Sequence, residues 1–369
     1  MKQGYLLTGD RLIHDDRAVI IEFNGPRRVL STSFFNGGFR EDLRALFNFS
    51  EVFGISDERC TMRAPTNEGH LRLIAGELGL DPLESTGLST AAKMKYAQAK
   101  SCSYDDFSVT AIVTAGIDAS GNRVGDPSFW HEKNGIPVVA NKPGTINIIL
   151  LVDALLTPGA MARALVTCTE AKTAALQELL AQSCFSRGLA TGSGTDGIII
   201  ASKLDSAVLL TNAGTHSKLG EYIGRVVRET VIEALVAENG FESFARGNLL
   251  KRVSRFGINT ESLWEAYRSL YRTNHPEKEH FLNKLESLNR NESLILQATT
   301  FAYLLDLLQW HMADPAGVVE AIDQLLGCSI LAGEHLLIAA TKNRAKITVL
   351  IDELARAYTW DLAFRIAKW

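Results

Sequence analysis

The chain has 369 residues, of which 46% are hydrophobic and 22% charged, so it can form two or three domains and is not disordered throughout. A net charge of -4 argues against a dominant role in binding nucleic acid or an anionic membrane. Five cysteines without CxxC or zinc-ligand spacing indicate reduced, buried thiols in a cytosol: Cys60, Cys102, Cys168, Cys184 and Cys328.

The N-terminal sequence MKQGYLLTGDRLIHDD has no uninterrupted apolar segment of the kind found in export signals. The longest apolar run, INIILLVDALL, is too short to span a bilayer and contains Asp153. We therefore expect a soluble, cytoplasmic protein.

Strands and helices alternate over the first 240 residues. The expected strands are rich in β-branched residues and bounded by Gly, Pro, Asn or Asp: 18–23, 28–34, 107–116, 145–153 and 197–202. One helix should begin after Thr157, which can cap it, with Pro158 at the first helical position. A second helix over 218–238 has an apolar stripe of Leu219, Ile223, Val226, Val227 and Val231. This part of the chain is predicted to be a mixed α/β domain.

The composition changes near Gly240, because 24 of the 29 glycines and seven of the nine prolines lie at or before it. The pattern beyond is helical. Residues 263–272 place Leu263, Ala266, Tyr267, Leu270 and Tyr271 on one face, and 293–312 are apolar nearly all round, as expected of a buried helix. Further helices fit 316–327, closed by Gly327, and 345–368. We predict a domain over 1–240 and an all-α domain of unknown function over 241–369.

General motifs exclude several classes of site. The stretch ATGSGTD (190–196) lacks the Gly-Lys-Ser/Thr ending of a phosphate loop, and it leads into a strand where a dinucleotide fingerprint leads into a helix. The chain has no HxH, HExxH or GxSxG motif. General motifs therefore reach no further than an α/β protein.

Polar groups at strand ends are the remaining candidates, since sites often lie on loops held by a rigid scaffold. The two-residue period of a strand from Thr145 puts Thr145 and Asn147 on one face with Ile149. Gly192 and Gly194 flank Ser193 and allow a close backbone approach or positive φ, although a plain turn would also use them.

Two charged residues in TCTEAKTAAL (167–176), Glu170 and Lys172, lie about 200° apart on an undistorted helix. Either one is a surface charge, or the poor helix formers Val166, Thr167 and Thr169 break the helix and let both converge. His216 precedes a helix start, where backbone N–H groups favour anions. Asn36 lies beside paired glycines, as in a hairpin turn.

Together these segments resemble the adenosylcobinamide amidohydrolase family of corrinoid salvage over about residues 28–238. The resemblance rests on the order and spacing of STSFFNGG (31–38), TAAKM (90–94), VTAGI (113–117), PGTINIILLVD (143–153), TCTEAKTAAL (167–176), ATGSGTD (190–196) and AGTHSKLGEYIG (213–224). Departures are Asp118 for an expected Asn, Cys168 for Ala and Ser193 for Thr.

The resemblance implies an α+β amidohydrolase domain, a mixed α/β sandwich, followed by the all-α C-terminal domain. It implies hydrolysis of the amide that joins aminopropanol to the corrin propionate, giving adenosylcobyric acid and 1-amino-2-propanol. The glycine loop would then aim N–H groups at a developing oxyanion, worth about 3 to 4 kcal/mol per donor of the roughly 8 to 23 kcal/mol required. We expect substrate-binding roles for Asn36, Gly144, Thr145, Asn147, Gly192, Ser193, Gly194 and Thr195.

Asp196 and Glu170 are the candidate general bases, and Lys172 or His216 could protonate the leaving amine. Thr195 or Ser193 could instead be a nucleophile, and Asp196, Glu170 and His216 could hold a metal. A third variant cleaves at Gly144-Thr145 to free an N-terminal Thr. No cofactor is certain beyond the adenosylated corrinoid substrate, and a homo-oligomer is possible. The alternative function is a corrinoid-binding or regulatory protein without turnover.

Overall fold

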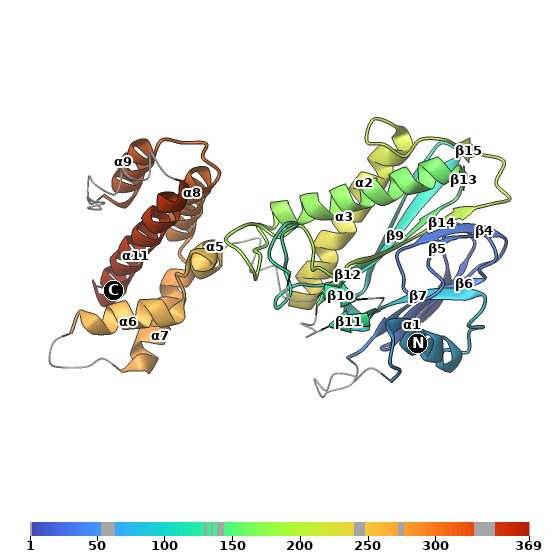
Figure 1. Cartoon of the computed structure of the whole chain (residues 1–369), viewed down its shortest axis with the longest axis horizontal. Helices are drawn as coiled ribbons and strands as arrows, with labels where there is room; N and C mark the ends of the chain where they lie inside the picture. The colour runs from blue at the N-terminus through green and yellow to red at the C-terminus, as the bar shows by residue number, and fades with distance from the viewer. Residues whose placement is uncertain are drawn as a thin grey trace. The chain divides into compact units, whose positions relative to one another are not determined.

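The computed structural model describes residues 2–52, 63–128, 131–133, 136–138, 144–239, 248–271, 277–327 and 344–368. The chain divides into two compact units, Met1–Phe241 and Glu242–Trp369. The first contains the strands and the second is helical (Figure 1). The α+β part followed by an all-α part is therefore confirmed. Gly240, where the domain boundary was predicted, lies outside the described residues, as do Cys60 and Cys328.

Two sheets form the centre of the first unit. One has the order β1 (Lys2–Tyr5), β2 (Arg11–His14), β3 (Ala18–Glu22), β6 (Ala45–Ser50) and β7 (Ser85–Thr90). The other has the order β5 (Gly38–Arg40), β4 (Arg27–Ser31), β14 (Gly197–Lys203), β12 (Thr145–Val152), β9 (Phe107–Gly116) and β8 (Gln98–Tyr104). Within them β6 runs parallel to β7 and β12 parallel to β14, and the other neighbours are antiparallel.

Short strand pairs complete the β structure. The pair β10 (His131–Lys133) and β11 (Ile136–Val138) is antiparallel. The pair β13 (Leu155–Leu156) and β15 (Leu209–Leu210) is parallel. Neither pair joins the two large sheets.

Helices cover both outer faces of the paired sheets. Side chains from β3, β4, β6, β7, β9, β12 and β14 form one core between the sheets. A second core lies between β3, β6 and helix α1 (Asn67–Glu77). On the six-stranded sheet, α3 (Lys218–Asn239) packs on β8 and β9, and α2 (Pro158–Glu178) packs on α3 and β14 (Figure 1). The unit is thus a four-layer sandwich of helix, sheet, sheet and helices.

The predicted strands are present, with small differences at their ends. Strand β9 covers the predicted residues 107–116, whereas β4 ends at Ser31, short of the predicted Phe34. The difference has a local cause: Ser31 Oγ accepts the N–H of Ser33 and Ser33 Oγ accepts the N–H of Phe35, so the chain turns there. Thr157 caps α2 through the N–H of Ala160, with Pro158 in the first turn, as predicted.

The second unit contains α5 (Leu249–Val253), the 3-10 turn η2 (Ser254–Phe256), α6 (Thr260–Ser269), α7 (Lys278–Asn289), α8 (Glu292–Gln309), α9 (Pro315–Leu326) and α11 (Arg344–Lys368). Gly327 ends α9 with a φ of 68°, as predicted. The expected burial of the 293–312 helix on all sides is wrong, since Leu296 is 64% exposed in α8. Leu270 and Tyr271 follow the end of α6; Tyr271 still packs against the core beside Tyr267, as predicted, whereas Leu270 is 37% exposed.

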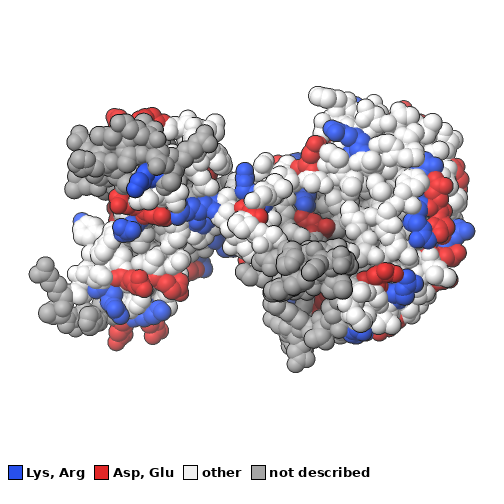
Figure 2. Space-filling model, viewed as in Figure 1, with Lys and Arg blue, Asp and Glu red and all other residues white. Residues whose placement is uncertain are grey.

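Membrane-spanning helices, surface charge and cysteine burial can be compared with the sequence predictions. The part of the chain that the structure describes has no helix long and apolar enough to cross a membrane. On the face drawn in Figure 2, acidic and basic side chains are interspersed over the first unit. Cys102 and Cys168 are partly and fully buried, but Cys184 is exposed, so the prediction of buried thiols is wrong for Cys184.

Candidate active site

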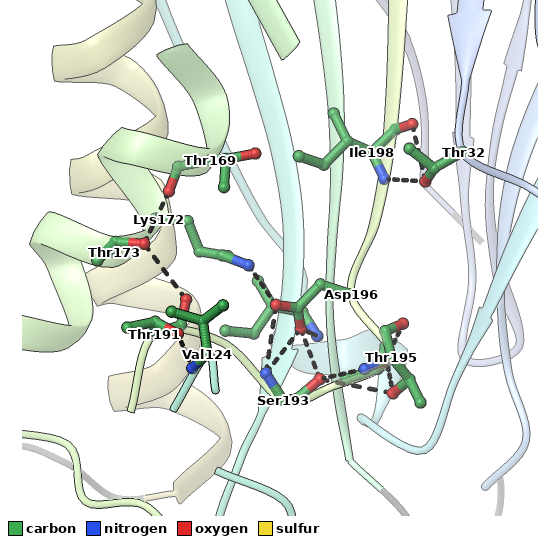
Figure 3. A network of polar contacts seen from close by, with 12 residues as sticks. Thr32, Val124, Thr169, Lys172, Thr173, Thr191, Ser193, Thr195, Asp196 and Ile198 are labelled. Carbon is green, nitrogen blue, oxygen red and sulfur yellow. Dashed lines mark hydrogen bonds and ion pairs between the residues drawn. The ribbon is translucent and has the colours of Figure 1, made fainter. Parts of the chain in front are cut away.

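A buried ion pair lies where β12 and β14 begin. Lys172 reaches from α2 to Asp196, the residue before β14, and its Nζ contacts Asp196 Oδ2 (Figure 3). Only 8% of the Lys172 side chain and 12% of the Asp196 side chain are exposed. Burying two charges costs desolvation free energy, which their mutual attraction offsets only when further hydrogen bonds satisfy both groups. This pair therefore needs additional hydrogen-bond partners.

The loop and strand backbones supply these bonds. Asp196 Oδ1 accepts the Ser193 hydroxyl at 2.5 Å and the N–H groups of Ser193 and Ile146 at 3.1 Å. The N–H of Ile146 belongs to β12, so one carboxylate ties the start of this strand to the 192–195 loop. Asp196 is therefore held as an oriented anion, which is the preorganisation that a catalytic charge requires.

Two threonine hydroxyls extend this group towards solvent. Thr195 Oγ1 donates to Gly144 O at 2.9 Å and lies 2.6 Å from Thr145 Oγ1. Ser193 Oγ lies 3.5 Å from Thr195 Oγ1. Ser193 and Thr145 are buried, whereas Thr195 is exposed. Thr195 is thus the hydroxyl of the group that a bound molecule reaches first.

The glycines around this group have different structural reasons. A Cβ on Gly192 would overlap Asp196 Oδ2 and lie 2.9 Å from Lys172 Nζ, so only glycine leaves room for the ion pair. Gly194 has a φ of +82°, but a Cβ there would come no closer than 3.9 Å to another residue. Gly144 has a φ of +135°, and a Cβ added there would overlap Ser120 Oγ. The glycine loop is therefore more than a turn at Gly192.

Helix α2 decides between Glu170 and Lys172. It is one helix from Pro158 to Glu178, which excludes a break near Thr169 and leaves the other alternative, that one of the two is a surface charge. Thr173 also ties it to the glycine loop, since its Oγ1 donates to Thr191 O at 3.3 Å (Figure 3). The helical period turns Lys172 inwards and leaves Glu170 exposed. The structure does not bring Glu170 to Asp196.

Other predicted residues lie away from the ion pair. His216 is exposed and precedes the start of α3 at Lys218. Asn36 has a φ of 48°, and its Nδ2 donates to Pro82 O and Ser85 O, which holds a turn.

Asn147 lies between the sheets, on the same face as Ile149 as the strand period predicts. Its Nδ2 donates to Asn48 Oδ1 at 2.8 Å and to Ser89 O at 2.9 Å. Asn48 in turn donates to Thr114 Oγ1 at 2.7 Å. This buried network joins the two sheets close to the start of β12. No general motif pointed to Asn48 or Thr114, because the three partners lie on strands far apart in the sequence.

Metal and thiol chemistry can be tested against the same geometry. Among the residues with described positions, no three His, Cys, Asp or Glu side chains form a group that could hold a metal ion. Asp196, Glu170 and His216, the set that could have held a metal, therefore do not come together. Burial raises the pKa of the Cys168 thiol, on the inner face of α2, to about 12, so this group stays protonated.

Comparisons with known proteins concern the first unit. The family model described as adenosylcobinamide amidohydrolase matches residues 5–243. An uncharacterized protein of Methanocaldococcus jannaschii is 36% identical over 240 residues, covering 62% of this chain and 90% of that protein. The adenosylcobinamide amidohydrolase of Methanosarcina mazei is 30% identical over 233 residues, covering 60% of this chain and 94% of its own.

Proposed function

The chain belongs to the adenosylcobinamide amidohydrolase family, and we propose that it cleaves the amide between the corrin propionate and aminopropanol, as a C–N hydrolase of corrinoid salvage. The products are adenosylcobyric acid and 1-amino-2-propanol. The observation that carries the proposal is the ion pair of Lys172 and Asp196, with its hydroxyls, inside the matched region. A fixed buried charge next to an exposed hydroxyl suits amide hydrolysis, which needs an activated oxygen nucleophile.

The hydroxyls provide a route for the proton of the attacking oxygen. Thr195 is the exposed member, Ser193 lies behind it, and Ser193 Oγ donates to Asp196 Oδ1. A proton that leaves the attacking oxygen passes through Ser193 to the carboxylate. Lys172 holds this carboxylate in place through the ion pair. Asp196 thus acts as a general base through a hydroxyl relay.

Two attacking oxygens fit this arrangement, the Thr195 hydroxyl and a water molecule beside it. Attack by Thr195 forms an ester between Thr195 and the corrin propionate, which water then hydrolyses. Attack by water forms no covalent intermediate. Mass spectrometry of acid-quenched enzyme during turnover separates the two routes, because only the first adds the mass of the corrinoid acyl group to the chain. The same measurement on resting enzyme excludes cleavage at Gly144-Thr145 if the mass is intact.

The proposed function is tested by incubating the full chain with adenosylcobinamide and separating the products by chromatography. We expect adenosylcobyric acid and 1-amino-2-propanol in equal amounts. Heat-inactivated protein is the control for spontaneous cleavage. Binding of the corrinoid without release of aminopropanol would contradict the proposal and favour a binding or regulatory protein.

Removal of the helical unit should leave turnover unchanged. The matched region makes up 94% of the Methanosarcina mazei protein, which leaves little chain for a counterpart of residues 242–369. All residues of the Lys172 and Asp196 group also lie before residue 241. A chain of residues 1–241 is expected to release aminopropanol at the rate of the full chain, measured by the same chromatography. Circular dichroism and gel filtration check its folding, and a folded but inactive short chain would show that the helical unit contributes to catalysis.

A further inference from the structure

The last turn of α3 brings a carboxylate to the same end of the sandwich as Asp196. Helix α3 runs from Lys218 to Asn239, so at about 1.5 Å per residue its ends lie roughly 30 Å apart. His216 precedes the first end, and Glu238 lies at the other. Glu238 is half-buried. Its position therefore depends on what the last turn of α3 contacts.

Glu238 contacts the segment after β7 and the end of β9. Its Oε2 accepts the backbone N–H of Lys93 at 3.0 Å. Its Cγ lies 3.7 Å from the place that a Cβ of Gly116 would occupy, and Ala92 Cβ lies 3.8 Å from that place. Gly116 is partly exposed. The carboxylate of Glu238 is thus anchored at the accessible end of β9.

The end of β9 connects Glu238 to the hydroxyl group of the site. Gly116 is the register partner of Thr145, so their side-chain positions lie on the same face of the sheet. Thr145 contacts Thr195 at 2.6 Å. In the sheet β12 lies between β9 and β14. Since neighbouring strands are about 4.8 Å apart, Gly116, which Glu238 contacts, and the start of β14 lie on the two sides of β12, roughly 10 Å apart.

The groups that face Glu238 set its charge. Burial raises the pKa of the Glu238 carboxyl above its usual 4.5, and the like charge of Asp118 acts in the same direction. The N–H of Lys93 and the charges of Lys93 and Lys95 oppose this shift. The net shift is upward, so Glu238 holds its proton to higher pH than an exposed glutamate does.

Amide cleavage also needs a proton donor, because an amine leaves poorly as an anion. Asp196 accepts N–H and O–H donors and lies behind Ser193, so it offers no proton to the leaving amine. Lys172 Nζ is held on Asp196, and His216 lies at the far end of α3. Glu238 is an acidic side chain next to Gly116, the register partner of Thr145, and is therefore a candidate donor on this side of β12.

We propose that Glu238 is a second carboxylate of this active site and that it protonates the leaving amine. The inference rests on the proposed function. As the C–N bond breaks, its electron pair takes the Glu238 proton, which gives 1-amino-2-propanol and a glutamate anion. The attacking oxygen forms the new C–O bond and its proton goes through Ser193 to Asp196. Solvent exchange returns a proton to Glu238 and removes one from Asp196.

The test is Glu238→Gln, compared with Glu233→Gln on the exposed side of the same helix. Glutamine still accepts the N–H of Lys93 but cannot donate an acid proton. We expect turnover of adenosylcobinamide, measured on the acidic side of the profile where Glu238 holds its proton, to fall about 100-fold. Turnover of the corresponding nitrophenyl ester of the propionate should be unchanged, because nitrophenolate leaves without protonation. Glu233→Gln should leave both substrates unaffected, since Glu233 is exposed and pairs with Lys100 at the surface.

The pH profile gives a second readout. A general acid works in its protonated form, so turnover of the amide should fall as pH rises through the pKa of Glu238, above 4.5. This fall should be absent for the ester and for the glutamine variant. The melting temperature of Glu238→Gln should be equal to or above that of the wild type near neutral pH, because the variant removes a partly buried charge.

Three results would overturn the inference. Unchanged amide turnover in Glu238→Gln would exclude Glu238 from catalysis and leave the proposed function intact. An equal fall for amide and ester would show that Glu238 only supports the structure. A wild-type chain that releases no aminopropanol would overturn the proposed function, and this inference with it.

Discussion

Asp196→Asn is expected to lower turnover of adenosylcobinamide by about 10³- to 10⁴-fold, the upper part of the range for a general base. Asparagine keeps the size and one acceptor oxygen of Asp196 but cannot take the proton that Ser193 passes on. It also leaves Lys172 as a charge with only 8% of its side chain exposed. Since one partner of a buried pair is lost, stability should fall by roughly 3 kcal/mol. Rates of aminopropanol release and urea unfolding measure the two effects.

A double variant separates catalysis from stability. Lys172→Met together with Asp196→Asn removes the uncompensated charge, so unfolding should return towards the wild-type free energy while turnover stays low. Glu170→Gln is the matched control on α2, because Glu170 is exposed on the other side of the helix. Recovery of turnover in the double variant would contradict the role of Asp196 as base. Loss of turnover in Glu170→Gln would show that the exposed face of α2 takes part in catalysis.

Gly192→Ala should have the next largest effect on turnover after Asp196→Asn. The added Cβ would overlap Asp196 Oδ2 and lie 2.9 Å from Lys172 Nζ. Asp196 cannot move away without losing the N–H groups of Ile146 and Ser193. We therefore expect the added Cβ to displace the side chains of Lys172 and Asp196 from their positions. The rate of aminopropanol release should fall about 10²- to 10³-fold, the loss typical when one fixed electrostatic contact is removed.

Gly194→Ala in the same loop is the control for backbone strain. Its φ of +82° disfavours alanine by about 1 to 2 kcal/mol, but its Cβ would find no atom closer than 3.9 Å. The variant should lose stability and keep most of its turnover. Equal turnover in Gly192→Ala and the wild type would show that the ion pair tolerates displacement and is not the catalytic charge.

Local signals determined much of the fold. The β-branched run 107–116 is a strand over the same residues, and Thr157 with Pro158 begins α2 as their chemistry predicts. Gly327 ends α9 because a left-handed residue suits glycine. Strand propensity and helix caps depend on residues that are close in sequence. Strands β6 and β7 were not predicted, because both are buried at nearly all positions and show no alternation of buried and exposed residues.

The site was only partly visible in the sequence. The glycine loop, Ser193, Thr195 and Asp196 stand within one short segment, and their resemblance to a known family identified them together. Lys172 and Glu170 could not be separated without knowing that α2 is unbroken and which of its faces meets β14. Its place before a helix start suggested His216, whereas no local signal singled out Glu238 in the last turn of α3.

The physical reason is the distance in sequence between the parts of the site. Asp196, Thr145 and Gly116 come together because β14, β12 and β9 are neighbours in one sheet. The strand order could not be predicted, because backbone hydrogen bonds between strands do not depend on residue type. Residue chemistry alone determined which loops could hold a site and which helices would form. Only the packing of α2 and α3 on that sheet decided that Lys172 and Glu238 reach it while Glu170 and His216 do not.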